Sequence, residues 1–60
     1  MLVTVRNNDN TSATYVFSPN GISRTAEVIK FYRESYRTLN IQGFQVKDDS
    51  GNVIAFGGSI

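Results

Sequence analysis

Hydrophobic and polar residues alternate near the start of the chain, and this pattern predicts two short strands. Residues 2–6 place Val3 and Val5 on one side of a strand, with polar residues between them. Residues 13–18 are rich in β-branched and aromatic side chains, which favour strands. The polar residues between the two runs are typical of a turn, so we expect an antiparallel hairpin.

The middle of the chain shows the spacing of an amphipathic helix. Ser23 is a candidate N-cap, Ile22 before it a candidate hydrophobic staple, and Asn40 suits the left-handed conformation that closes a helix. At about 100° per residue, the apolar positions fall on one broad arc that we expect to pack on a sheet. This arc contains Ile22, Ala26, Val28, Ile29, Tyr32, Tyr36 and Leu39.

Two further strands are predicted at residues 41–47 and 52–56, joined by a polar turn. The element order ββαββ predicts an α+β fold, with a four-stranded, largely antiparallel sheet and one helix packed on one face. We expect residues 1–60 to form a single domain. This order of elements resembles that of the β-grasp group, and the compact plan resembles that of small phage proteins that inhibit host enzymes. The resemblance implies a fold but no functional residue.

The composition of so short a chain limits the functions that it can have. A domain of 60 residues buries only about 60% of its unfolded surface, and without Cys or His the chain lacks disulfides and the commonest metal ligand. Association with another chain is therefore expected. The 40% hydrophobic content predicts a folded protein, and the net charge of +1 is small. No run resembles an export signal or a membrane span, so we expect a cytoplasmic protein.

We predict that the chain is not an enzyme and binds no cofactor or metal. The usual acid–base and nucleophilic groups, His and Cys, are absent. Residues 48–52 indicate a polar turn, because a calcium loop needs more oxygen ligands at longer spacing. Residues 56–59, Phe-Gly-Gly-Ser, resemble the diglycine end of ubiquitin-like sulfur carriers, but two residues follow the glycines. We predict a flexible tail there.

Apolar residues on both sides of the predicted strands indicate a surface for another chain. Tyr15, Phe17, Val16, Val53 and Ile54 cannot all point to the same side of the sheet. We therefore expect a homodimer or a stable partner, bound through the open sheet face around Tyr15 and Phe17 or through an edge strand.

Phe31 is the residue that the helical spacing leaves unexplained, because it lies off the apolar arc among polar residues. Three alternatives are open: accidental exposure, an aromatic anchor for a partner, or a core residue if the helix is rotated. We interpret the chain as a small non-enzymatic protein-protein interaction module, a candidate regulator or inhibitor of a larger host enzyme. Its candidate partner-binding residues are Phe31, Tyr15, Phe17, Arg24, Glu27 and Glu34.

The alternative interpretation is a nucleic-acid-binding module that uses the basic side of the helix. Its candidate residues are Lys30, Arg33, Arg37 and Arg24. The small net charge weighs against it, and Glu27 and Glu34 interrupt the basic patch, where we expect them to pair with Lys30. Neither a membrane nor a small-molecule substrate is expected.

Overall fold

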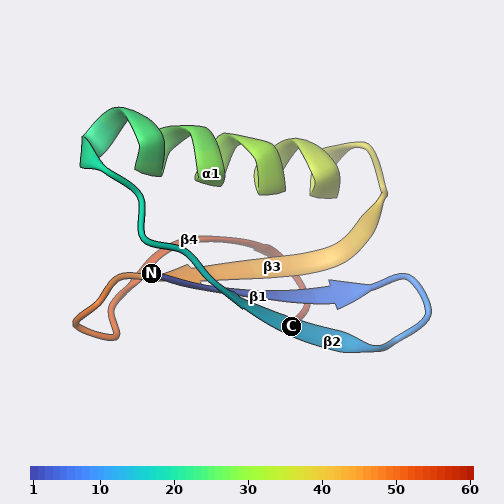
Figure 1. Ribbon diagram of the computed structural model, residues 1–60. Helices are drawn as coiled ribbons and strands as arrows, with labels where there is room; N and C mark the ends of the chain where they lie inside the picture. Colours follow the sequence, from blue (N-terminus) through green and yellow to red (C-terminus); the bar gives the residue numbers. More distant parts are fainter.

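The computed structural model describes all residues, 1–60, as one sheet and one helix. The order confirms the predicted ββαββ, α+β architecture, and the helix lies across one face of the sheet (Figure 1). The elements are β1 (Leu2–Asn7), β2 (Ser12–Val16), α1 (Gly21–Arg37), β3 (Ile41–Lys47) and β4 (Val53–Gly58). The bounds of β3 are as predicted, whereas β2 ends two residues earlier and β4 two residues later than the sequence indicated.

The sheet has the order β2-β1-β3-β4, and all neighbouring strands are antiparallel. Two bulges interrupt the ladders. Gln42 of β3 has no partner, because Arg6 pairs with Gly43 and Asn7 with Ile41. Ile54 is unpaired in β4 in the same way. A bulge bends its strand and increases the local twist, so β4, an edge strand, is irregular, while β2, the other edge, pairs with β1 without a shift.

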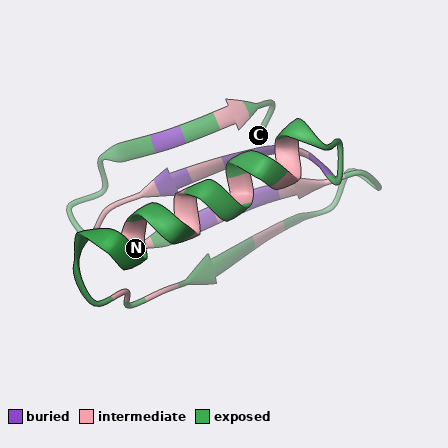
Figure 2. Cartoon of the chain, turned by 90° about the horizontal axis from the view of Figure 1, so that it is seen from above, coloured by how far each residue is buried: buried purple, intermediate pink, exposed green.

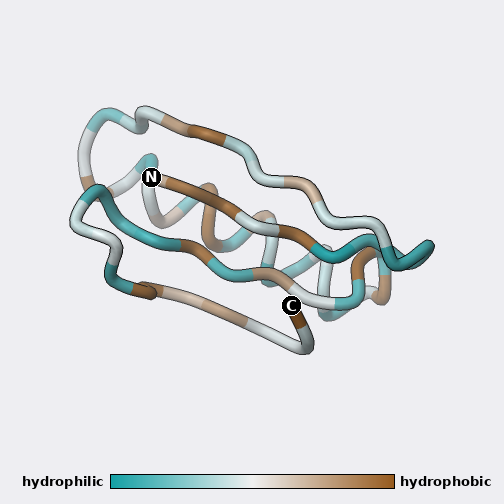
Figure 3. Tube along the Cα trace, turned by 90° about the horizontal axis from the view of Figure 1, so that it is seen from below, coloured by the Kyte–Doolittle hydropathy of each residue, from teal (hydrophilic) through white to brown (hydrophobic).

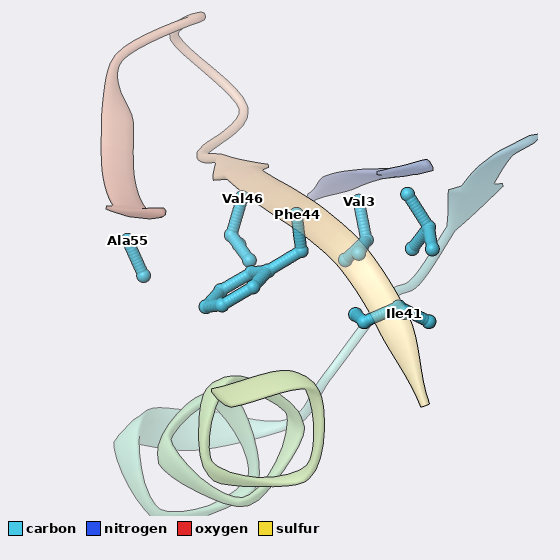
Figure 4. Packing of buried hydrophobic residues seen from close by; sticks show 6 residues of the cluster. Val3, Ile41, Phe44, Val46 and Ala55 are labelled. Atoms are coloured by element: carbon cyan, nitrogen blue, oxygen red, sulfur yellow. The ribbon is translucent and has the colours of Figure 1, made fainter. Parts of the chain in front are cut away.

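The core lies between the sheet and the helix. Val3, Val5, Phe44 and Val46 are buried, which confirms the predicted alternation in β1 and β3. The sheet side chains labelled in Figure 4 gather in the layer between the strands and α1. The helix adds four partly buried side chains and no fully buried one. These four are Val28, Ile29, Tyr32 and Tyr36.

The start of the helix differs from the prediction. The helix begins at Gly21, and the residue at the N-cap position, Asn20, makes no side-chain capping bond. Ser23 is therefore not the cap, and Ile22 is not a staple, because its side chain is 90% exposed. Ala26 is also exposed. The reason is that the helix contacts the core through a narrower face than the predicted arc. Ile22 and Ala26 lie outside this contacting face.

The end of the helix also differs, because Leu39 and not Asn40 takes the left-handed conformation, with φ 65°. Leu39 is 77% exposed and follows the last helical residue, so helical spacing no longer places it on the core face. The Asn40 N–H donates to the Ser35 carbonyl at 2.9 Å. Asn8, in the β1–β2 loop, donates its side-chain amide to the Leu39 and Asn40 carbonyls at 2.9 and 3.2 Å. These bonds satisfy free carbonyl groups after the helix.

Gly57 and Gly58 belong to β4, so the prediction of a flexible diglycine tail is wrong. Gly57 opposes Phe44, and a Cβ atom there would lie 2.8 Å from the Phe44 ring and 2.9 Å from the Tyr36 ring. Gly58 has φ 65°, and a Cβ atom there would clash with the Gln42 carbonyl oxygen. The chain then turns beneath the sheet and returns beside β3 (Figure 3). The two glycines make room for the Tyr36 ring against the sheet.

We expect Gly58→Ala to lower the free energy of unfolding by about 2–4 kcal/mol, because the left-handed cost of a Cβ adds to overpacking against backbone. Gly51→Ala is the matched control: Gly51 also has positive φ, 86°, but a Cβ there meets nothing within 4 Å. Its expected loss is about 1–2 kcal/mol. Urea denaturation measures both, and equal losses would contradict the packing role of Gly58.

Candidate protein-binding cleft

The helix covers its face of the sheet unevenly and leaves the part next to β2 uncovered. The α1 backbone runs nearest β3 and β4 and stays further from β1 and β2. The Tyr32 and Tyr36 rings pack on Phe44, with ring centroids 6.5 and 6.4 Å from it. Strand β2, with four of its five residues exposed, lies to one side of the helix (Figure 2). A cleft therefore forms between α1 and the segment that leaves β2.

We call this hollow the aromatic cleft, and its volume is about 290 Å³. It is lined by Phe17, Arg24, Glu27, Val28, Phe31 and Tyr32. The Tyr32 ring meets Phe31 edge-on at 5.1 Å and 88°, and it meets Phe17 edge-on at 6.3 Å and 68°. Edge-to-face contact is a favoured geometry for aromatic pairs. The three rings therefore support one another, with Tyr32 between the other two.

Phe31 stands at the rim of the aromatic cleft, where 64% of its side chain is exposed. The helical spacing already placed it off the apolar arc, and the structure confirms this position. The alternative of a rotated helix with Phe31 in the core is wrong. Phe31 still keeps one edge-on contact with Tyr32, so its ring is held in place while its other surfaces face water.

An ion pair flanks Phe31 on the same side of the helix. The Arg24 guanidinium donates to a Glu27 carboxylate oxygen at 3.0 Å, and both side chains are exposed. The predicted pairing of Glu27 with Lys30 does not form, because Arg24 takes this partner. An exposed pair contributes only about 0–1 kcal/mol to stability. The Arg24–Glu27 pair therefore places polar groups beside the apolar cleft and adds little to stability.

The aromatic cleft continues toward the start of the helix. A second hollow of about 340 Å³ shares Phe17, Arg24 and Val28 with it and adds Ser18 and Pro19. Phe17 is half-buried and packs against the core. The connected hollows follow one flank of α1, so the surface is elongated.

Tyr15 and Phe17 both lie on the helix side of the sheet, so the prediction that they mark the open face is wrong, and Phe17 packs against the core and Tyr32. Tyr15 pairs with Val3, which is buried beneath the helix, and opposite residues of adjacent strands point to the same side. The pKa of Tyr32 is raised, first by burial and then by the charge of Tyr15. A tyrosine hydroxyl with an ordinary pKa of about 10 is already protonated at neutral pH, so the Tyr32 hydroxyl is available as a hydrogen-bond donor with or without this rise.

The remaining candidate residues lie elsewhere on the helix. Glu34 pairs with Arg37 and not with Lys30, and this bond lowers the pKa of Glu34 and raises that of Arg37. By helical spacing, Lys30, Arg33 and Arg37 share a flank that points away from the aromatic cleft, whereas Arg24 lines it. The four basic residues of the nucleic-acid alternative thus lie on two different sides of the helix.

No protein-family model, curated protein or solved structure matches this chain. No helix in the structure is both long enough and apolar enough to cross a membrane.

The sheet face opposite the helix carries a second set of exposed apolar side chains. Val16 pairs with Leu2 at one edge, and Phe56 pairs with Gln45 at the other. Val16 is 75% exposed and Phe56 72% exposed. The sequence indicated surplus apolar surface, but Phe56, the last residue of the predicted strand, was not among the residues expected to form it. This face is less hollowed than the aromatic cleft, because none of the hollows lies over these residues.

The carboxylates of the turns have local structural tasks. Asp48 accepts the backbone N–H groups of Ser50 and Asn52, each at 2.9 Å, and these bonds lower its pKa. Bonds from Thr11 lower the pKa of Asp9 in the same way. Residues 48–52 form the predicted polar turn, with Gly51 at positive φ. The structure contains no group of three or more residues of the types that bind metals.

Sequence reasoning missed the floor of the aromatic cleft. The apolar arc predicts core positions for Val28 and Tyr32, but both are only half-buried because the cleft opens beside them. Four residues of the apolar arc pack against the core, as predicted, whereas Ile22, Ala26 and Leu39 do not. The arc carried no information on how far the helix sits from β2, which depends on packing against distant residues.

We expect Phe17 and Phe31 to differ in their effect on stability. Phe17→Ala removes a half-buried ring from the core margin and should lower the free energy of unfolding by about 2–4 kcal/mol. Phe31→Ala removes a mostly exposed ring and should change it by about 0.5 kcal/mol or less. Thermal and urea denaturation of both variants test this contrast, and a loss for Phe31→Ala as large as that for Phe17→Ala would contradict the assignment.

Proposed function

We propose that this protein is a non-enzymatic protein-protein interaction module that binds its partner at the aromatic cleft. The observation that carries the proposal is the exposure of Phe31, a large aromatic side chain held at the rim of an apolar hollow. Large apolar side chains that stay exposed beside a hollow mark interaction sites more often than single scattered ones.

The surroundings of Phe31 match those of an interface anchor. A few aromatic or Arg residues supply most of the binding energy in protein interfaces, and polar neighbours around them exclude water. Phe31 has an apolar floor on one side, Val28 and Tyr32, and the Arg24–Glu27 pair close by. A partner that inserts an apolar side chain into the cleft would cover Phe31 and leave this pair at the wet edge.

Binding is proposed as the whole activity. The carboxylates either shape turns or pair with neighbouring Arg side chains, and their pKa shifts have those local causes. A small domain whose contact surface lies along a helix suits a regulator or inhibitor that blocks a larger host enzyme. The cytoplasmic location stays a prediction from the sequence.

Nucleic-acid binding is the weaker proposal. Arg24 belongs to the aromatic cleft and Arg37 is paired with Glu34. Only Lys30 and Arg33 remain as helix cations without an ion pair. Phosphate binding usually draws on more unpaired positive charge than this.

The test begins with a partner isolated from the source cell by affinity purification, followed by titration of purified components. We expect Phe31→Ala to weaken binding by about 2 kcal/mol or more, which is about 30-fold in Kd. Phe56→Ala is the matched control, because it removes a similarly exposed Phe from the opposite face. We expect it to leave the affinity within about threefold.

A Phe31→Ala variant that binds as tightly as the parent would contradict the proposed cleft. Loss of binding in Phe56→Ala alone would move the contact to the uncovered face of the sheet. The stability of each variant, measured in parallel, separates loss of contact from loss of folding.

A further inference from the structure

The hydrogen-bond pattern between β1 and β2 shows which backbone groups of β2 point outward. The Phe17 N–H donates to the Met1 carbonyl at 2.9 Å, and the Asn7 N–H donates to the Thr11 carbonyl at 2.8 Å. These two pairs lie at opposite ends of the hairpin. In an antiparallel ladder, bonded and non-bonded pairs alternate.

It follows that Ala13 and Tyr15 direct their backbone groups toward β1. The alternate residues of the strand direct theirs away from the sheet, where the structure has no neighbouring strand. The outward groups are the N–H and C=O of Ser12, Thr14 and Val16. This edge therefore presents a regular row of donors and acceptors to water.

The β2 edge has none of the features that usually prevent pairing between molecules. Proteins protect edges with charges, proline, bulges or a covering element. Strand β2 has the sequence Ser-Ala-Thr-Tyr-Val, without charge or proline, and pairs with β1 without a bulge. The helix backbone stays away from it. The other edge, β4, carries the Ile54 bulge and two glycines.

We propose that β2 pairs antiparallel with β2 of a second copy of this chain, with the two-fold axis at Thr14. The outward N–H groups of each copy then donate to outward C=O groups of the other. The pairing doubles the four-stranded sheet and places both helices on the same face. This interface is isologous, because the same edge is used in both copies.

The side chains of β2 favour this partner over an unrelated peptide. About the axis at Thr14, Tyr15 of one copy faces Ala13 of the other on the helix side. On the opposite side, Val16 faces Ser12. Each large side chain thus meets a small one, and cross-strand pairs of this kind add to pairing of the backbone. With no charge on either strand, like-charge repulsion does not oppose the contact.

The contact buries little surface, and this sets the protein concentration at which the dimer forms. A five-residue strand is about 17 Å long, and interfaces that bury less than about 1,200 Å² in total are weak. We therefore expect a dimer that dissociates in the micromolar range. The inference does not rest on the proposed function, because Phe31 lies on the helix and the pairing uses the backbone of β2.

Sedimentation velocity across a concentration series tests the proposal. The parent chain should change from monomer to dimer, and Thr14→Pro should weaken the dimer by at least about tenfold. Proline removes an outward N–H group while leaving the bonds to β1 intact. Thr14→Ala is the matched control, because it keeps this N–H group, and it should still form the dimer. Circular dichroism shows whether each variant is folded.

A cross-linking experiment decides the matter if Thr14→Pro does not fold. The chain has no Cys, and Thr14→Cys places the two sulfurs across the axis, with Cα atoms about 5.5 Å apart. It should form disulfide-linked dimers at least about tenfold faster than Ser23→Cys on the helix surface.

Three results would overturn the proposal. They are a parent chain that stays monomeric at millimolar concentration, a dimer that persists in folded Thr14→Pro, and equal cross-linking rates for the two Cys variants.

Discussion

The packing of Tyr32 and Tyr36 on Phe44 decides where the helix lies, and most other features depend on it. Phe44 is fully buried on an inner strand, and the glycine opposite it leaves space for the Tyr36 ring. A helix is about 10–12 Å wide, whereas four strands about 4.8 Å apart form a broader surface. Because the aromatic contacts draw α1 toward β3 and β4, the surface next to β2 stays uncovered.

The aromatic cleft and the free edge of β2 are two consequences of this single placement. The cleft opens where the helix flank and the segment after β2 do not meet, and Phe31 stands at its rim. The edge stays free because no element covers it. A chain of this size has few side chains to close such gaps, and only six hydrophobic residues form its core. Binding to other chains is a natural use of a surface that the fold leaves open.

The sequence allowed good predictions of the strands and of the element order, and poor ones of the helix ends and of positions that depend on distant contacts. The strands and the position of Phe31 off the apolar arc could be predicted because alternation and helical spacing are local properties of the chain. The side on which Tyr15 lies depends on its register with Val3, which strand propensity does not show. The role of Gly57 and Gly58 was hidden, because the tyrosine ring that they accommodate comes from a distant helix. Short-range ion pairs were also missed, since several partners lie within reach of each glutamate.

The placement of the helix is tested most directly by proton NMR of a dilute, isotope-labelled sample. The account predicts nuclear Overhauser contacts from the Tyr36 ring to the Phe44 ring and to the Gly57 α-protons, whose signals should be shifted upfield by the ring. It also predicts no contacts from the Tyr36 ring to β2. Contacts from Tyr36 to Ala13 or Thr14, with none to Gly57, would place the helix over the other half of the sheet and contradict the account.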